Sequence, residues 1–454
     1  MVMRNFSKHS RQYPTLARDI IKIDGLGSSS DQFWNTWKDA VLDLACDASD
    51  QSHLLTLIKR AVTALCDAQE GSRAVSILAD LARIVPSSLE LIMKNFEASF
   101  PYWKNPQSGP QLQNFTRNAL NLGMELPQIL ERIIDFLTKK ILLIDLSIRS
   151  EDVPYLFTSS DSVENNLIDT ESSEKLSGNL KGLGEKYSQE EKAREQEEAQ
   201  QARKNHLEQV RDYAMKIDSM LLSIFEFMEK AKFKGKSREI GLFVLISFEK
   251  NVLLAAKPKF TQFLIFYAAE IDNFIADRLL GSLLACFFSR DSQLSTTGQK
   301  NISNNPTKAK NIFSSSAFMT SFVKKSNSLT ETELKMVIEL LLECIGRKIE
   351  ALTLFSKTPT ELSILASIFE TIFTIFMTYP ALFVEDSRLT QAAELVVDSL
   401  PSSIKSHEFF DKLFKGATFD LNEPSTMHHS FMPFESLPLP TSRQFLLNTG
   451  ILRE

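Results

Sequence analysis

The chain contains little glycine, tyrosine or cysteine. Its 454 residues include 15 Gly, 7 Tyr and 4 Cys, against 33 Phe. Few glycines beside many apolar residues disfavour a turn-rich sheet and favour helices. The four cysteines lie far apart and form no Cys-x-x-Cys pair. This spacing excludes the common zinc and redox motifs and predicts buried, reduced thiols in an intracellular protein.

A long apolar run and a basic excess are also missing. Stretches such as 141–146 and 279–288 are too short, or too closely flanked by charge, to cross a bilayer. The first residues show no apolar segment of signal-peptide length. The formal net charge of -6 equals that of segment 161–198, which holds 11 acidic and 5 basic residues, so the remainder is neutral. Proteins that grip nucleic-acid phosphates usually have a basic face. We therefore expect no membrane association and no strong direct DNA binding.

What the sequence does contain is apolar residues at the 3.6-residue period of amphipathic helices. Within 52–66, Leu54, Ile58 and Leu65 fall on one face, and a second such pattern begins near Pro127. Short polar breaks separate successive patterns, and helices joined by short links pack as antiparallel pairs. No strand-like alternation persists. Because no fixed sequence period is present, we predict an all-α fold, an α-solenoid of degenerate HEAT-type helix pairs.

The patterning divides the chain into four predicted segments. Residues 1–150 and 206–420 form N-terminal and C-terminal HEAT-type repeats. Between them, 151–205 is an acidic insertion with too few apolar residues to offset the entropy of ordering, and we predict that it is disordered. Its second half, from Gln189, could instead form a solvated helix or the charged start of the next helix. Prolines disfavour a long helix in 421–454 and predict an extended C-terminal strap.

No motif indicates an enzyme. Gly235-Lys236-Ser237 resembles the end of a phosphate-binding loop, but Lys230 stands where that motif needs glycine, and a helix precedes it instead of a strand. His428-His429 has no further ligand at metal-binding spacing. The chain has no Gly-x-Ser-x-Gly elbow and no His-Glu-x-x-His motif. We predict no catalytic site, no metal and no cofactor.

Several short segments occur in a recognisable order around the acidic insertion. They are 84–89 with Phe100-Pro101, 115–122, 140–146, 215–221, 261–267 with 274–280, 321–326 and 431–435. The series is similar to segments of the RNA polymerase I-specific transcription initiation factor family (TIF-IA), whose members also carry an acidic insertion. Lys324 and Ser326 replace two alanines of the family pattern, and the first 80 residues match it poorly. The chain is identified as a divergent member.

The resemblance implies a non-enzymatic HEAT-repeat factor that binds RNA polymerase I near its stalk. It also implies a bridge to promoter-bound core initiation factors at ribosomal RNA genes, in the nucleus and nucleolus. Some relatives dimerise, which leaves a homodimer open. Ser87 and Ser88 align with the family's polymerase-docking serine patch, where phosphorylation blocks docking. The alternative is that Ser87 only caps a helix that begins at Leu89.

Two further sets of residues are candidate contacts. Lys324 and Lys325 either face an acidic partner or end a helix whose C-terminus favours cations. The C-terminal strap either packs on the last repeats or binds another protein; its candidate residues are Phe431, Pro433, Phe434 and Leu437. The competing interpretations of the whole chain are a generic helical-repeat scaffold or transport adaptor, and an enzyme of unknown helical class.

Overall fold

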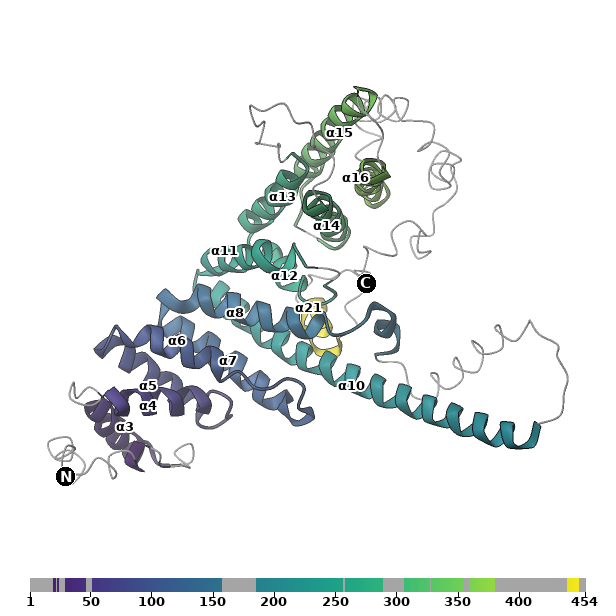
Figure 1. Cartoon of the computed structure of the whole chain (residues 1–454). Coiled ribbons are helices and arrows are strands. Elements are labelled where there is room, and N and C mark those ends of the chain that lie inside the picture. Colours follow the sequence, from purple (N-terminus) through teal and green to yellow (C-terminus); the bar gives the residue numbers. More distant parts are fainter. Residues whose placement is uncertain are drawn as a thin grey trace, which may run out of the picture. The chain divides into compact units, whose positions relative to one another are not determined.

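The computed structural model describes residues 19–21, 23, 29–45, 51–156, 185–255, 258–288, 306–326, 328–354, 359–379 and 439–448. Helices are the only regular elements in these ranges (Figure 1). The all-α prediction is therefore confirmed. None of the described helices is both long and apolar enough to span a bilayer.

Two compact units make up the chain. Unit 1 comprises Met1–Phe227 with Pro438–Ser442, and unit 2 comprises Met228–Leu437 with Arg443–Glu454. The boundary cuts through helix α10 (Glu185–Phe233) and does not coincide with the predicted insertion 151–205.

Unit 1 is built from successive antiparallel helix pairs, which Figure 1 shows stacked in chain order. Each pair buries its apolar stripes against the next, as expected for helices that cannot stand alone. The short 3₁₀ helices η3 (Pro106–Ser108) and η4 (Ser150–Tyr155) belong to the connections. The six helices of the pairs are α3 (Asp31–Ala45), α4 (Gln51–Ala64), α5 (Gly71–Ile84), α6 (Ser88–Ala98), α7 (Gly109–Glu125) and α8 (Pro127–Asp145).

A structural repeat is present although the sequence has no fixed period. Ion pairs connect α3 to α5, α5 to α7, and α6 to α8, and in four of them the partners are 42 positions apart. Equivalent helices of neighbouring pairs therefore lie side by side at a nearly constant sequence distance, which is the geometry of degenerate HEAT repeats. These pairs are Lys38–Asp80 (3.0 Å), Arg73–Asp31 (3.1 Å), Arg83–Glu125 (2.7 Å) and Arg132–Glu90 (2.5 Å).

Four phenylalanines form the centre of the α6–α8 core. Phe96 lies 4.8 Å from Phe115 and 5.2 Å from Phe136, measured between ring centroids. Phe100 lies 5.5 Å from Phe115 and 5.6 Å from Phe136. Edge-on and tilted ring pairs at these distances contribute more than their buried area alone. The Phe100-Pro101 segment therefore ends α6 by inserting a ring between α7 and α8.

Several helices of unit 2 are more apolar than the paired helices of unit 1. Residues 263–269 of α12 are all buried, so this helix lies inside the unit. Helices α14 and α16 contact through buried hydroxyls: Ser316 donates to the Ser367 carbonyl at 2.6 Å, and Thr320 donates to Thr371 at 3.1 Å. The elements are α11 (Ser237–Ser247), the π-helix η5 (Phe248–Val252), α12 (Phe263–Ile271), α13 (Asn273–Phe288), α14 (Pro306–Lys325), α15 (Glu331–Leu354), α16 (Pro359–Thr378) and α21 (Pro440–Asn448).

The structure differs from the sequence-based prediction in two segments. Residues 185–205, placed in the disordered insertion, form the charged start of α10, because Glu, Lys, Arg, Gln and Ala are good helix formers. This is the alternative that the sequence left open for the stretch from Gln189. Residues 157–184 lie outside the described residues. In the predicted strap, 440–448 form helix α21, whose first position is a proline, where this residue is tolerated.

Candidate protein-interaction surface

The corner between α5 and α6 carries the first predicted site. Helix α5 ends at Ile84, and the amide of Val85 donates to the Leu81 carbonyl at 2.8 Å. Pro86 follows and cannot continue the helix. The chain then enters α6, so the corner is short and fixed at both ends. Two large apolar side chains lie exposed on it, Ile84 at 55% and Leu91 at 39% of their possible surface.

The two serines of this corner have different environments. Ser87 is the N-cap residue of α6 and is exposed, but its side chain makes no capping hydrogen bond. Ser88 begins the helix and is fully buried, and its Oγ has no hydrogen-bond partner among the described residues. Capping therefore does not account for the Ser87 hydroxyl, which is exposed. The Ser88 side chain belongs to the core.

Exposed ion pairs surround the corner. Arg83 donates to Glu125 at 2.7 Å and to Asp80 at 3.0 Å, and Arg132 contacts Glu90 at 2.5 Å. The hydrogen bond to Glu125 is the main reason why the pKa of Arg83 lies above its usual value. Solvent-exposed pairs of this kind contribute little to stability. The corner thus has an apolar centre, a free hydroxyl and a charged rim, which is the composition of a protein interface.

The other predicted residues lie elsewhere. Lys324 and Lys325 are the last residues of α14 in unit 2; Lys324 is half-buried, and the Lys325 side chain lies outside what the structure describes. The adjoining Ser326 is buried and donates to the Glu270 carboxylate. The strap residues Phe431, Pro433, Phe434 and Leu437 also lie outside the described residues.

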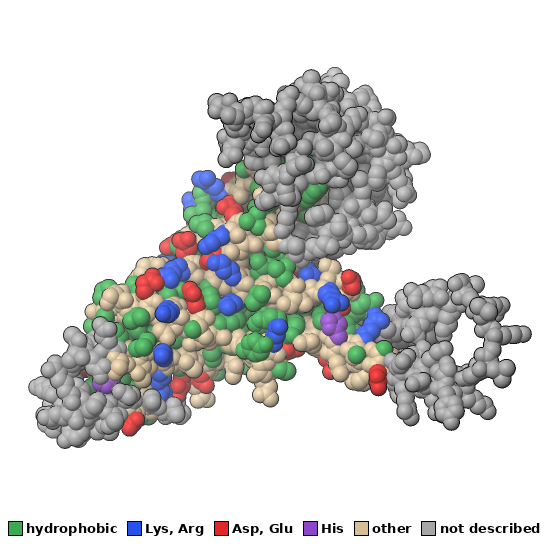
Figure 2. Space-filling view, in the orientation of Figure 1, with side chains coloured by type: hydrophobic (Ala, Val, Ile, Leu, Met, Phe, Trp, Pro, Cys, Tyr) green, Lys and Arg blue, Asp and Glu red, His purple; other side chains and the backbone are tan. Residues whose placement is uncertain are grey.

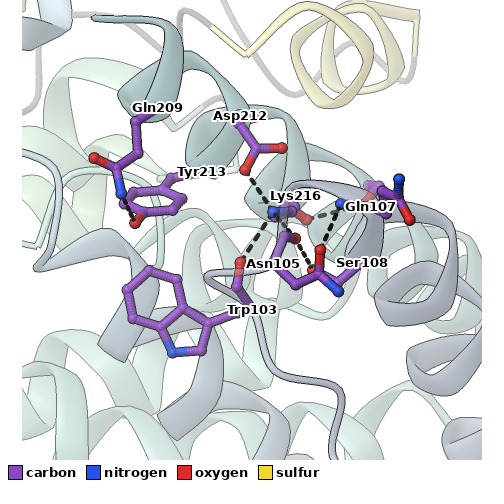
Figure 3. A network of polar contacts seen from close by, with 9 residues as sticks. Trp103, Asn105, Gln107, Ser108, Gln209, Asp212, Tyr213 and Lys216 are labelled. Atoms are coloured by element: carbon purple, nitrogen blue, oxygen red, sulfur yellow. Dashed lines mark hydrogen bonds and ion pairs between the residues drawn. The ribbon is translucent and has the colours of Figure 1, made fainter. Parts of the chain in front are cut away.

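Sequence reasoning missed a buried lysine in α10 (Figure 3). The side chain of Lys216 is 1% exposed. Its Nζ donates to the Trp103 carbonyl at 2.9 Å, to the Asn105 carbonyl at 2.7 Å, and to Asp212 Oδ2 at 2.5 Å. The ring of Tyr213, one turn before, meets Trp103 edge-on at 4.8 Å. Together these contacts hold the connection between α6 and α7 against α10.

A buried aspartate two positions further along α10 holds a second segment. Residues two apart on a helix point about 200° from each other, so Asp218 leaves the opposite side from Lys216. Its carboxylate accepts the amides of Thr441 at 3.0 Å and Ser442 at 2.7 Å, and Ser442 Oγ donates to its carbonyl at 3.0 Å. Asp218 thus supplies the N-terminal cap of α21 from a distant part of the sequence.

Stacked helix pairs held by internal polar clamps define the chain as an α-solenoid protein. Among the described residues, no cluster of His, Cys, Asp or Glu could hold a metal ion. The model of the family described as RNA polymerase I specific transcription initiation factor RRN3 matches residues 23–377, and the chain belongs to this family. The resemblance read from the sequence is thereby confirmed.

A solved structure supports the fold. The structure titled "Crystal Structure of RNA Polymerase I Transcription Initiation Factor Rrn3" aligns with a TM-score of 0.66 and 14% identity. The alignment covers 100% of this chain and 89% of that chain. No curated protein sequence matches significantly. The likeness therefore lies in the arrangement of helices, while the surfaces have to be read from this chain.

Proposed function

We propose that the chain recruits RNA polymerase I to ribosomal RNA genes by binding the polymerase near its stalk and joining it to promoter-bound core factors. Membership of the initiation-factor family supports this assignment. It would act in the nucleus, within the nucleolus where those genes are transcribed. The observation that carries the docking site is the α5–α6 corner, where Ile84, Ser87 and Leu91 are all exposed.

The corner suits a contact that phosphorylation can abolish. Fully burying an exposed aliphatic side chain stabilises a complex by about 1.5–3 kcal/mol, so Ile84 and Leu91 can anchor a partner. A phosphate on Ser87 would add about -1.5 to -2 charges at the centre of that contact. Within the chain, the same phosphate lies at a helix N-terminus, where negative charge is favourable. Modification of Ser87 would therefore weaken docking without unfolding α6.

The experiment compares co-migration of the purified chain with RNA polymerase I and with polymerase II. Wild type should bind polymerase I selectively, and Ser87→Asp should weaken binding at least tenfold, as should Ile84→Ala combined with Leu91→Ala. The matched control is Ser52→Asp, which adds a carboxylate to the first turn of α4, the equivalent helix of the preceding repeat. Ser88→Asp is unsuitable because it buries a charge and should unfold the repeat.

Each outcome has a distinct meaning. Selective binding that none of the variants changes would keep the polymerase partner and refute the corner. An equal loss with Ser52→Asp would show a general charge effect. No selectivity between the polymerases would leave the generic scaffold or transport adaptor as the better description. Sedimentation of the free chain in the same buffer tests for a homodimer.

Contact with the promoter-bound factors requires a second surface, for which we propose the end of α14. Lys324 forms no ion pair with any described residue and is accessible in part, which supports a contact with an acidic partner. Lys324→Glu with Lys325→Glu should reduce capture of the promoter complex and leave polymerase binding unchanged. A loss of both would indicate misfolding of unit 2.

A further inference from the structure

The connection between α10 and α11 in unit 2 concentrates positive charge. Residues 230–238 contain five cations and no acidic residue. Lys230, Lys232 and Lys234 are exposed. None of the three forms an ion pair with a described residue. In Figure 2, basic side chains lie among acidic ones over the region that α11 occupies in Figure 1. The near-neutral composition of the folded body therefore hides one strongly basic segment, which we call the basic loop.

The backbone of the basic loop is fixed. Gly235 has φ of 68°, and the amide of Lys236 donates to the Ala231 carbonyl at 2.9 Å. The Gly235 amide donates to the Lys232 carbonyl at 3.0 Å, which completes a Schellman C-cap. Since these amides are used inside the cap, Gly235-Lys236-Ser237 cannot cradle a phosphate as a nucleotide loop does. The cap instead presents the neighbouring side chains in a defined arrangement.

Phe233 stands out from the middle of the basic loop. It is the last residue of α10 and is 83% exposed, the highest value among the exposed large hydrophobic residues described. Lys232 and Lys234 flank it in sequence. By contrast, Arg238 is engaged, since it pairs with Asp272 at 3.5 Å and covers the ring of Phe274 at 4.7 Å.

Attraction between lysines and the C-terminus of α10 does not fully explain the composition of the basic loop. It accounts for Lys230 and Lys232, which lie in the last helical turn. It does not account for Lys234, which lies beyond the helix, or for an exposed aromatic ring. Leaving Phe233 in water forgoes about 1.5–3 kcal/mol of burial. The combination of ring and cations indicates a ligand that offers both a flat apolar face and negative charge.

We propose that the basic loop binds single-stranded nucleic acid, with a base stacked on Phe233 and phosphates beside Lys230, Lys232 and Lys234. Stacking on an exposed aromatic ring combined with backbone contacts to lysines is how such strands are held without sequence preference. The surroundings of the ring favour this ligand over a protein partner, because the residues on either side of Phe233 are lysines. The next exposed large hydrophobic residue along the chain is Ile246 on α11, 44% exposed.

The inferred site is compatible with the expectation of no strong direct DNA binding. Three lysines and one ring predict moderate, salt-sensitive affinity for an unpaired strand, and a paired duplex offers no free base face to Phe233. The inference does not rest on polymerase docking. Because its test uses an oligonucleotide and the full chain without polymerase, failure of one proposal leaves the other intact.

The test measures fluorescence anisotropy of a labelled oligo-dT strand titrated with the full chain at low salt, and repeats the titration at several salt concentrations. Phe233→Ala should lower affinity about fivefold or more, as expected for a lost stacking contact. Lys232→Gln with Lys234→Gln should reduce the slope of log affinity against log salt by about 1.4, since each phosphate contact to a single strand contributes about 0.7.

Matched controls come from unit 1. Tyr102→Ala removes another exposed aromatic ring (69% exposed), and Lys94→Gln with Arg117→Gln removes two other exposed cations. Both should leave binding unchanged. Thermal melting checks that every variant is folded.

Three results would overturn the proposal. These are absence of binding by wild type at low salt, equal affinity of wild type and Phe233→Ala, and equal effects of the control variants. Competition with polyglutamate or with anionic lipid vesicles provides a further arm. If polyglutamate or the vesicles displace the labelled strand as effectively as unlabelled oligo-dT does, the loop recognises negative charge alone. The nucleic-acid assignment is then wrong.

Discussion

Replacing Lys216 by Met should destabilise unit 1 by about 3 kcal/mol. The substitution keeps most of the aliphatic stem but removes the ammonium group that donates to the carbonyls of Trp103 and Asn105 and to Asp212. Breaking a buried charge network by removing one partner costs about 3–5 kcal/mol. The lower end applies here because Asp212 is 31% exposed and can turn to water.

The assay follows from the distribution of tryptophan. Trp34, Trp37 and Trp103 are the only tryptophans, and all three lie in unit 1. Urea unfolding monitored by tryptophan fluorescence therefore reports on this unit. In a unit of this size, about 3 kcal/mol corresponds to a melting temperature lower by about 6–12 °C.

The control is Lys94→Met, which removes an exposed lysine of α6 and should change the free energy of unfolding by less than about 0.5 kcal/mol. A loss below about 1 kcal/mol for Lys216→Met would refute the assignment of Lys216 as a clamp. Asp212→Asn should lower stability less than Lys216→Met, because Lys216 would keep both carbonyl acceptors.

Two other contacts lead to measurable effects. Asp218→Asn weakens the charged cap of α21, so the amides of Thr441 and Ser442 should exchange with deuterium about 10- to 100-fold faster; unchanged exchange would contradict the capping role. Burial, followed by the hydrogen bond to Glu229, raises the pKa of Tyr267. The buried, neutral Tyr267 side chain therefore contributes to folding stability at pH values below about 10, the pKa of tyrosine in the unfolded chain. This contribution is lost as pH rises above that value. Circular dichroism should show wild type losing more stability than Tyr267→Phe above pH 10, and parallel curves would argue against this.

The sequence predicted best those helices whose apolar residues recur at the 3.6-residue period. The pattern that begins near Pro127 became α8, which starts at that residue. Ile58 of the predicted face is fully buried in α4, and Leu65, just beyond the end of this helix, is fully buried as well. Local period suffices here because one face of each helix has to be covered by a neighbouring repeat, whatever the identity of that neighbour.

The candidate sites depend on information that local patterns do not contain. The predicted start of α6 at Leu89 lies one residue after the observed start at Ser88, and one residue rotates a helix by about 100°. Such a shift separates an exposed serine from a buried one. Asp212 lies four positions from Lys216 and is visible as a helical ion pair in the sequence. The carbonyl acceptors of Lys216 and the amide donors to Asp218 lie more than 100 positions away, so no local pattern shows that these charges are buried.

Most segments that carry the family resemblance contain core residues, although 84–89 and 321–326 also contain the proposed surface residues Ser87 and Lys324. The segments that identified the family include Phe100, Lys216, Asp218 and Tyr267, and in the structure these side chains fill the core or hold one helix against another. A chain can therefore keep the family's fold while its partner surfaces diverge. Ser87→Asp and Lys216→Met test the partner surface and the fold separately. The first should weaken polymerase binding at least tenfold at unchanged stability. The second should lower stability and impair binding only to the extent that unit 1 unfolds.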